Sequence, residues 1–170
     1  ARRTARAGSY SFNSTLIGNV YDGAGVDSIF INSGSSMAGD IFIGDDTNIV
    51  NIAGSMTGDI IGGNNQAVIS VGGLLQGDVS SGSLADLITI AGRVNGTIDS
   101  GEGGDVISII GTNSLHLAGR LNAGGGSDTV LLQGSSAAIV DAGTGSDSVT
   151  LSSLSSLSGS VSLGDGDDSY

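Results

Sequence analysis

The residues best suited to chemistry in this sequence are aspartates that follow closely spaced glycines. In the stretch SGEGGDVISIIG, residues 100–111, Gly101 and Gly103 precede Asp105, and β-branched residues follow directly. Glycine readily adopts the positive φ angles of tight turns. An aspartate carboxylate can bind a divalent cation or accept a hydrogen bond from the turn backbone. The stretch therefore allows a calcium-binding loop or a corner that needs no ion.

The same phrase recurs along the chain. Its pattern is Gly-x-Gly-x-Asp followed by apolar residues two positions apart, and successive anchor positions lie 19 to 23 residues apart. Some copies depart from it, with Asn48 or Ala67 at the anchor position, or with Leu84 in place of the second glycine before Asp86. A regular period of this length predicts a repeat protein. The complete copies are Gly23, Gly25 and Asp27; Gly101, Gly103 and Asp105; Gly124, Gly126 and Asp128; Gly143, Gly145 and Asp147; and Gly164, Gly166 and Asp168.

Two strand-like segments must position these corners. After each anchor, apolar residues such as Ile107 and Ile109 lie two apart and so face one side of a strand. A second phrase, apolar-x-Gly-x-apolar, lies between anchors, as in residues 56–60. Helical spacing is not sustained anywhere. The pattern predicts two short strands per coil, with the glycines of the second phrase in mid-strand, where they let two facing sheets approach closely. These glycines are Gly58, Gly77 and Gly96.

Stacking of such coils predicts an all-β fold, a parallel β-solenoid of the β-roll or β-helix kind. The spacing indicates about 8 coils of 19–23 residues, and stacking at about 4.8 Å per coil gives a rod about 35–40 Å long. We assign residues 9–170 to a single solenoid repeat domain and residues 1–8 to a basic N-terminal arm. The alternative, a disordered Gly/Ser-rich tract, does not explain apolar pairs that keep their register from copy to copy.

Composition excludes several classes of protein. The net charge of −12, with 17 acidic residues and 5 arginines, argues against a nucleic-acid partner. No apolar run is long enough for a membrane span. The chain has no cysteine, so disulfides and thiol chemistry are absent.

The Gly-x-Gly-x-Asp-x-apolar phrase resembles the repeat of hemolysin-type calcium-binding (RTX) proteins. That resemblance implies a parallel β-roll outside the cell, with calcium held in the turns by aspartate side chains and backbone carbonyls. The sequence departs from the family because the phrase occurs once per coil and lacks the leading glycine. The second corner, with Gly-Asp-Ile and Gly-Asp-Val, looks like repeats of bacterial autotransporter passengers and adhesins.

Calcium ions are therefore a possible cofactor, and the residues of the complete copies are the candidate ligands. The three copies from Asp105 onward are consecutive with one another, so neighbouring turns could share ions. In the alternative, glycine supplies the turn geometry and aspartate bonds the turn backbone without any ion. Both interpretations remain open at this point.

Other candidate sites have simpler explanations. Asp40, Asp59 and Asp78 occupy equivalent coil positions about 5 Å apart, where a cation or outward splay would relieve their repulsion. His116 lies in the inserted residues of the longest coil, and we expect it in a surface loop. GEGGD lacks the lysine of a phosphate loop. Because no partners are placed beside His116, we expect no enzymatic activity.

The function expected from the sequence is structural. It is an extracellular bacterial β-solenoid that forms a stalk, fibre or matrix filament, by head-to-tail pairing of copies and with calcium as a stabiliser. The open sheet edges of a solenoid invite such pairing. The alternative is an adhesin or ligand-binding repeat module of a larger cell-surface or biofilm protein, with a surface glycan or cell-envelope partner.

Overall fold

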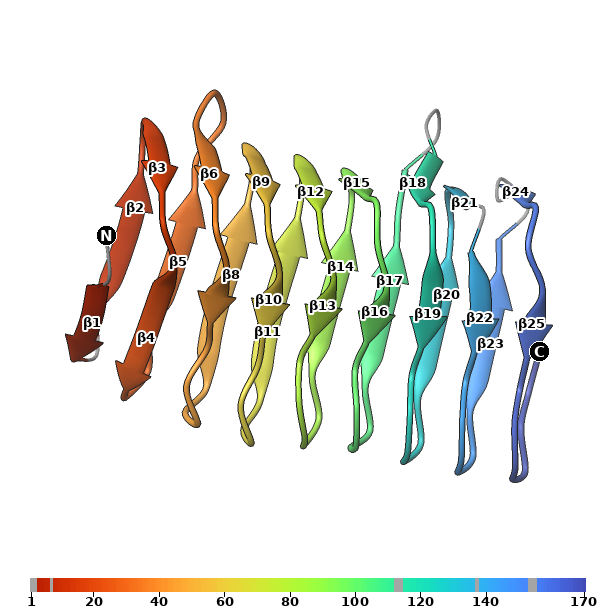
Figure 1. Ribbon diagram of the computed structural model, residues 1–170. Helices are drawn as coiled ribbons and strands as arrows, with labels where there is room; N and C mark the ends of the chain where they lie inside the picture. Colours follow the sequence, from red (N-terminus) through yellow and green to blue (C-terminus); the bar gives the residue numbers. More distant parts are fainter. Residues whose placement is uncertain (1–2, 7, 112–114, 137, 153–155) are drawn as a thin grey trace.

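The computed structural model describes residues 3–6, 8–111, 115–136, 138–152 and 156–170. Within these residues the chain forms short strands and no helix, and it winds into a parallel β-solenoid (Figure 1). The strands stack into three parallel sheets, which we name A, B and C. This architecture confirms the fold class that the repeats predict.

The three sheets run along the length of the rod. Sheet A contains β1 (Arg3–Arg6), β4 (Val20–Ala24), β7 (Ile41–Phe42), β10 (Ile60–Ile61), β13 (Val79–Ser80), β16 (Ile98–Asp99), β19 (Arg120–Asn122), β22 (Ile139–Asp141) and β25 (Val161–Ser162). Sheet B contains β2 (Ser9–Phe12), β5 (Ser28–Ile31), β8 (Asn48–Ile52), β11 (Ala67–Val71), β14 (Leu87–Ile90), β17 (Val106–Ile109), β20 (Thr129–Leu132) and β23 (Ser148–Leu151). Sheet C contains β3 (Thr15–Ile17), β6 (Ser36–Ala38), β9 (Ser55–Thr57), β12 (Leu74–Gln76), β15 (Arg93–Val94), β18 (Leu115–Leu117), β21 (Ser135–Ser136) and β24 (Ser156–Leu157).

Successive coils are paired in register. The chain passes from β14 in sheet B through β15 in sheet C to β16 in sheet A, and the next coil repeats this path. Ile88 therefore pairs with Ile107, and Ile90 pairs with Ile109. Equivalent side chains lie above one another at the spacing of neighbouring strands, about 4.8 Å.

These columns of aliphatic side chains fill the interior. Strand side chains alternate between the two faces of a sheet, so every second residue points inward. The inward residues of the three sheets form one continuous core along the rod. The largest fully buried side chains are Ile29, Ile31, Ile41, Ile52, Met56, Ile60, Ile69, Leu75, Ile88, Ile90, Ile98 and Ile107.

The second predicted strand of each coil divides into two. Met56 belongs to β9 in sheet C and Ile60 belongs to β10 in sheet A, with Gly58 at the bend between them at φ +133°. A Cβ atom at Gly58 would lie 2.2 Å from the Gly39 carbonyl oxygen of the preceding coil. The prediction that Gly58, Gly77 and Gly96 lie in mid-strand is therefore wrong, because they lie between sheets C and A.

Part of the basic arm continues sheet A. Residues Arg3–Arg6 form β1, which pairs in parallel with β4. In the part of the chain that the structure describes, no helix has the length and apolar character needed to cross a membrane.

Candidate functional site: two aspartate ladders

Five anchor aspartates point into the solenoid. Asp27, Asp86, Asp105, Asp128 and Asp147 are each at most 2% exposed. Each lies one residue ahead of a sheet B strand, at the corner where the chain enters that sheet. The first residue of the strand points outward, so the alternation of side chains turns the anchor inward.

Each anchor binds the backbone of the coil before it. The Asp86 N–H donates to Asp105 Oδ1 at 2.8 Å, and the Asp105 N–H donates to Asp128 Oδ1 at 2.7 Å. The Asp128 N–H donates to Asp147 Oδ1 at 2.8 Å, and the Asp147 N–H donates to Asp168 Oδ1 at 2.9 Å. We call this column, Asp86 to Asp168, the buried ladder. It satisfies a backbone donor that would otherwise be buried without a partner at each corner.

Earlier coils show what happens when the anchor changes. The Asp27 N–H donates to Asn48 Oδ1 at 2.7 Å, so an amide replaces the carboxylate there without loss of the bond. Ala67 has no acceptor, and the Asn48 N–H donates instead to the Gln66 carbonyl oxygen at 3.2 Å. The ladder bond therefore requires a side-chain oxygen at the anchor, and it does not require a charge.

The second carboxylate oxygen of each buried anchor has no hydrogen-bond partner. This holds for the Oδ2 atoms of Asp27, Asp86, Asp105, Asp128 and Asp147. Loss of contact with water raises the pKa of Asp105 to about 6, against the lowering effect of the hydrogen bond from the Asp86 N–H. Desolvation also raises the pKa of Asp128 to about 6 and raises the pKa of Asp86.

Asp22 is a buried acid that the sequence reasoning missed. Burial is the largest cause that raises its pKa to about 7, followed by the neighbouring carboxylate of Asp27. Its side chain is 1% exposed, and its Oδ1 has no partner. Equivalent positions in other coils hold the apolar residues Ile43, Ala123 and Ala142, which are also buried. Apolar residues at this position are the sequence signal that Asp22 faces inward.

The glycines of the corner lie directly against the backbone of the preceding coil. Gly126 has φ +134°, and a Cβ atom there would lie 1.5 Å from the Gly103 carbonyl oxygen of the preceding coil. Leu84 occupies the same place in the coil before Gly103 and has φ +71°, with 53% of its surface exposed. An L-residue in this left-handed region is strained, so the corners whose backbone takes this positive φ favour glycine.

The predicted calcium ligands are brought into columns, but their carbonyls are engaged. The carbonyl oxygens of Gly101, Gly124 and Gly143 each accept a hydrogen bond from the next coil, at 2.8 to 2.9 Å. Among the described residues, no three His, Asp or Glu side chains converge on one point. The atoms that fit a cation are the unpartnered Oδ2 oxygens, because calcium prefers anionic oxygen ligands.

A second column of aspartates lies at the bend between sheets C and A. The Asp59 N–H donates to Asp40 Oδ1 at 3.1 Å, the Asp78 N–H donates to Asp59 Oδ1 at 2.8 Å, and the Thr97 N–H donates to Asp78 Oδ1 at 2.7 Å. Asn19 begins the column by accepting from the Asp40 N–H. We call this column, Asn19 to Asp78, the surface ladder, because its members are half-buried or exposed.

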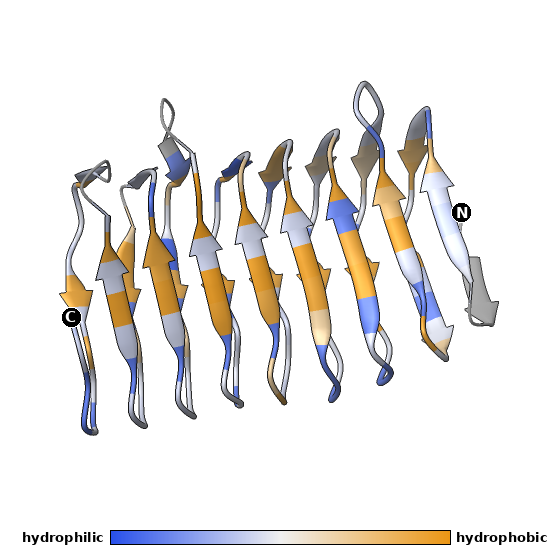
Figure 2. Ribbon diagram, turned by 180° about the vertical axis from the view of Figure 1, so that it is seen from behind, coloured by the Kyte–Doolittle hydropathy of each residue, from blue (hydrophilic) through white to orange (hydrophobic). Residues whose placement is uncertain are grey.

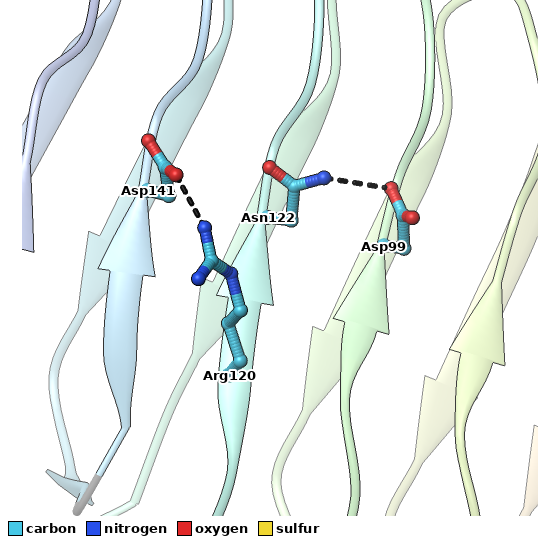
Figure 3. Close-up of polar contacts among 4 residues, drawn as sticks. All are labelled: Asp99, Arg120, Asn122 and Asp141. Carbon is cyan, nitrogen blue, oxygen red and sulfur yellow. Dashed lines mark hydrogen bonds and ion pairs between the residues drawn. The ribbon is translucent and has the colours of Figure 1, made fainter.

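Further polar pairs continue across the outer face of sheet A. Asn122 Nδ2 donates to Asp99 Oδ1 at 3.2 Å, and Arg120 forms an ion pair with Asp141 (Figure 3). The Arg120 side chain is half exposed, and exposed pairs of this kind contribute at most about 1 kcal/mol. These contacts tie neighbouring coils together and leave the face polar.

His116 is buried, so the prediction of a surface-loop histidine is wrong. It lies in β18 and is 5% exposed. Its Nδ1 donates to the Gly92 carbonyl oxygen at 2.6 Å, while Nε2 has no hydrogen-bond partner. The imidazole packs close to Gly111 and Gly134, where added Cβ atoms would lie 2.4 to 2.6 Å from the ring. The insertion in this coil therefore supplies a buried side chain, that of His116, which packs against glycines at a corner of the solenoid.

No protein-family model matches this chain, and neither curated proteins nor solved structures show a match to it.

Proposed function

We propose that the chain is a structural β-solenoid, a length of an extracellular bacterial stalk, fibre or matrix filament in which copies stack end to end. The observation that carries this proposal is the parallel pairing of neighbouring coils in all three sheets, which keeps its register except at two irregularities, one between β1 and β4 and one between β18 and β21. A coil from a second copy can add to the end strands with the same pairing. Parallel strand edges that are left open favour such addition.

The two ends of the described rod offer apolar surfaces for this contact. At the last coil, a shallow depression is lined by Leu151, Leu157, Val161, Leu163 and Tyr170. These residues extend the columns that are fully buried inside the rod. A stacked coil would remove them from water, and each Å² of apolar surface buried contributes about 25 cal/mol.

The opposite end presents aromatic side chains in the matching columns. Tyr10 pairs with Ile29, and Phe12 pairs with Ile31, so both continue the sheet B columns. Both aromatic residues are half-buried and pack on the core. Charge also differs between the end coils of the described rod, since β1 contains Arg3 and Arg6 whereas Asp165, Asp167 and Asp168 lie in the last coil. A basic segment and an acidic segment would meet in a head-to-tail stack.

The experiment that tests this proposal measures the length of particles by electron microscopy and small-angle scattering as concentration increases. We expect rods that lengthen at constant cross-section. Leu163→Glu places a charge in the end depression and should keep the rods short. Gln76→Glu, on the exposed face of β12, is the matched control and should leave the lengthening unchanged. Particles that stay one chain long at every concentration would contradict the proposal.

Calcium is a second part of the proposal, favoured by the unpartnered Oδ2 oxygens of the buried ladder. The RTX resemblance supports the same ion and an extracellular location. A cation bound to these oxygens would offset their burial and raise the melting temperature. Melting followed by circular dichroism with calcium and with chelator tests this. A calcium-dependent rise that Asp105→Asn weakens supports the ion, and identical curves would remove it.

We also infer a role without catalysis. The one histidine of the sequence is buried, and its Nδ1 is occupied by the Gly92 carbonyl oxygen. The buried carboxyls are sealed from water by the core, where a substrate could not reach them. Both features favour groups that hold coils together.

A further inference from the structure

The outer face of sheet B carries no charged side chain. The strands of this sheet read SYSF, SIFI, NIVNI, AVISV, LITI, VISI, TVLL and SVTL, and none contains Asp, Glu, Lys, Arg or His. Sheet A, in contrast, includes Asp99, Arg120 and Asp141, and sheet C includes Arg93. On a chain with net charge −12, one whole face is therefore neutral.

An aliphatic stripe crosses the middle of this face. Ile49, Val68, Leu87 and Val106 are paired in register in four consecutive coils. Ile49, Leu87 and Val106 are 38%, 40% and 41% exposed, and Val68 is half-buried. Figure 2 shows sheet B from this side, with colours that include the inward core residues as well as the outward ones. The neighbouring outward column is polar and uncharged, and its members are Asn51, Ser70, Thr89 and Ser108.

Charge decides what such a face can contact. Two copies of this acidic chain repel each other wherever their carboxylates face one another, and like charges brought together cost several kcal/mol. On the outer face of sheet B no charged group has to be desolvated, and the aliphatic stripe gains by leaving water. The stripe also matches itself when a second rod is turned to face it.

We propose that the outer face of sheet B is the contact surface for a second copy of this chain, sheet B against sheet B, so that rods pair side by side. Stacked sheets of this kind pack about 10 Å apart. The contact uses a surface separate from the two ends, so either contact can form without the other.

The size of the face predicts a weak pair. The eight strands are separated by seven spacings of about 4.8 Å, and each strand contributes about four residues at about 3.3 Å. The face therefore measures about 34 by 13 Å, or roughly 450 Å² per copy. The total of roughly 900 Å² lies below the 1,200–2,000 Å² of stable interfaces. A single chain should therefore pair only at high concentration. A longer rod, if the proposed stacking holds, would add this area with each copy and pair firmly.

The test is the mass per unit length of the rods, measured by small-angle scattering over a concentration series. Lateral pairing doubles this quantity, whereas end-to-end stacking leaves it unchanged. The test variant is Leu87→Glu with Val106→Glu, two neighbours in register at the centre of the stripe. The matched control is Thr57→Glu with Gln76→Glu, also neighbours in register but on the exposed face of sheet C.

We expect the mass per length of the wild-type chain and of the control to approach twice that of a single rod, while the test variant stays single. Its pairing constant should fall by at least about tenfold. The milder pair Leu87→Ser with Val106→Ser should give the same direction if the charged variant fails to fold. Equal loss in the control would overturn the proposal, as would single rods of wild type at the highest soluble concentration. If single wild-type rods instead bind a neutral polysaccharide, the face belongs to a glycan partner.

Discussion

The buried ladder and the surface ladder use the same bond in opposite directions. In the buried ladder the backbone of one coil donates to the carboxylate of the next coil, as from the Asp105 N–H to Asp128 Oδ1. In the surface ladder the backbone of the later coil donates to the earlier carboxylate, as from the Asp59 N–H to Asp40 Oδ1. Both align neighbouring coils, yet only the buried ladder leaves its second oxygens away from water without a partner.

That difference shows that the contribution of a ladder to the unfolding free energy depends on whether water can solvate the second carboxylate oxygen. A charged oxygen that remains solvated adds a coil-to-coil bond at little expense. A charged oxygen in the core must lose its hydration, which disfavours the ionised form. The buried ladder should therefore be most stabilising when Asp86, Asp105 and Asp128, whose pKa values burial raises, are protonated.

The largest expected effect comes from the glycines beside the two ladders. Gly126→Ala next to the buried ladder and Gly58→Ala beside the surface ladder both place a Cβ against a backbone carbonyl, at 1.5 and 2.2 Å. Each should lower the unfolding free energy by more than about 3 kcal/mol, through overpacking and left-handed strain. Urea denaturation measures this loss of unfolding free energy.

Gly34→Ala is the control for those substitutions. Gly34 has φ +79° but no atom within 4 Å of an added Cβ. It should cost only the strain of the left-handed conformation, about 1 kcal/mol. If all three variants lose the same stability, the close approach of the coils is not what demands glycine.

The pH dependence of stability is the next largest effect. The pKa values of Asp105, Asp128 and Asp22 are raised to about 6, 6 and 7 from an ordinary value near 4. Their contribution is complete below pH about 4 and is lost as pH rises through 6 to 7. Without added calcium, the unfolding free energy should fall between pH 4 and 7.5, because the unfolded chain releases these protons at a lower pH than the folded chain does. Stability that rises over this range would contradict the buried state of these carboxyls.

A smaller gain should come from restoring the missing glycine at the corner. Leu84→Gly relieves a left-handed leucine, and little buried surface is lost because Leu84 is largely exposed. We expect an increase of about 1 kcal/mol in the unfolding free energy. Leu87→Gly, at a leucine that is 40% exposed in a regular strand, is the comparison and should lower stability. A loss in Leu84→Gly would mean that its side chain matters more than its backbone.

Much of the fold follows from the sequence because the same phrase recurs every 19 to 23 residues. Apolar residues two apart after each anchor predict strands, and the recurring anchor predicts that residues such as Asp128 and Asp147 stack. The same reasoning places Asp40 and Asp59 in one column, as the structure has them. What repeats in sequence must repeat in space when coils are in register.

Other features depend on information that spacing does not contain. The phrase around Gly58 has the alternation of a strand, and only the positive φ of its glycine reveals a bend. His116 lies in an insertion that looks like a loop, but its partner is the carbonyl of Gly92, 24 residues earlier. The burial of Asp22 depends on which side of the corner faces inward. Only a comparison with the equivalent residues of other coils indicates that side.

The most direct test of this account is the pH profile of unfolding for Asp128→Asn and Asp59→Asn. Asparagine keeps a side-chain oxygen, as Asn48 does in the native ladder. Asp128→Asn should stabilise the protein by roughly 1 kcal/mol at pH 7.5 and make its pH dependence less steep, because the charge of Asp128 no longer has to be desolvated. Asp59→Asn should follow the wild-type profile. The same response from both variants, or a loss of stability in Asp128→Asn at pH 7.5, would contradict the distinction between the two ladders.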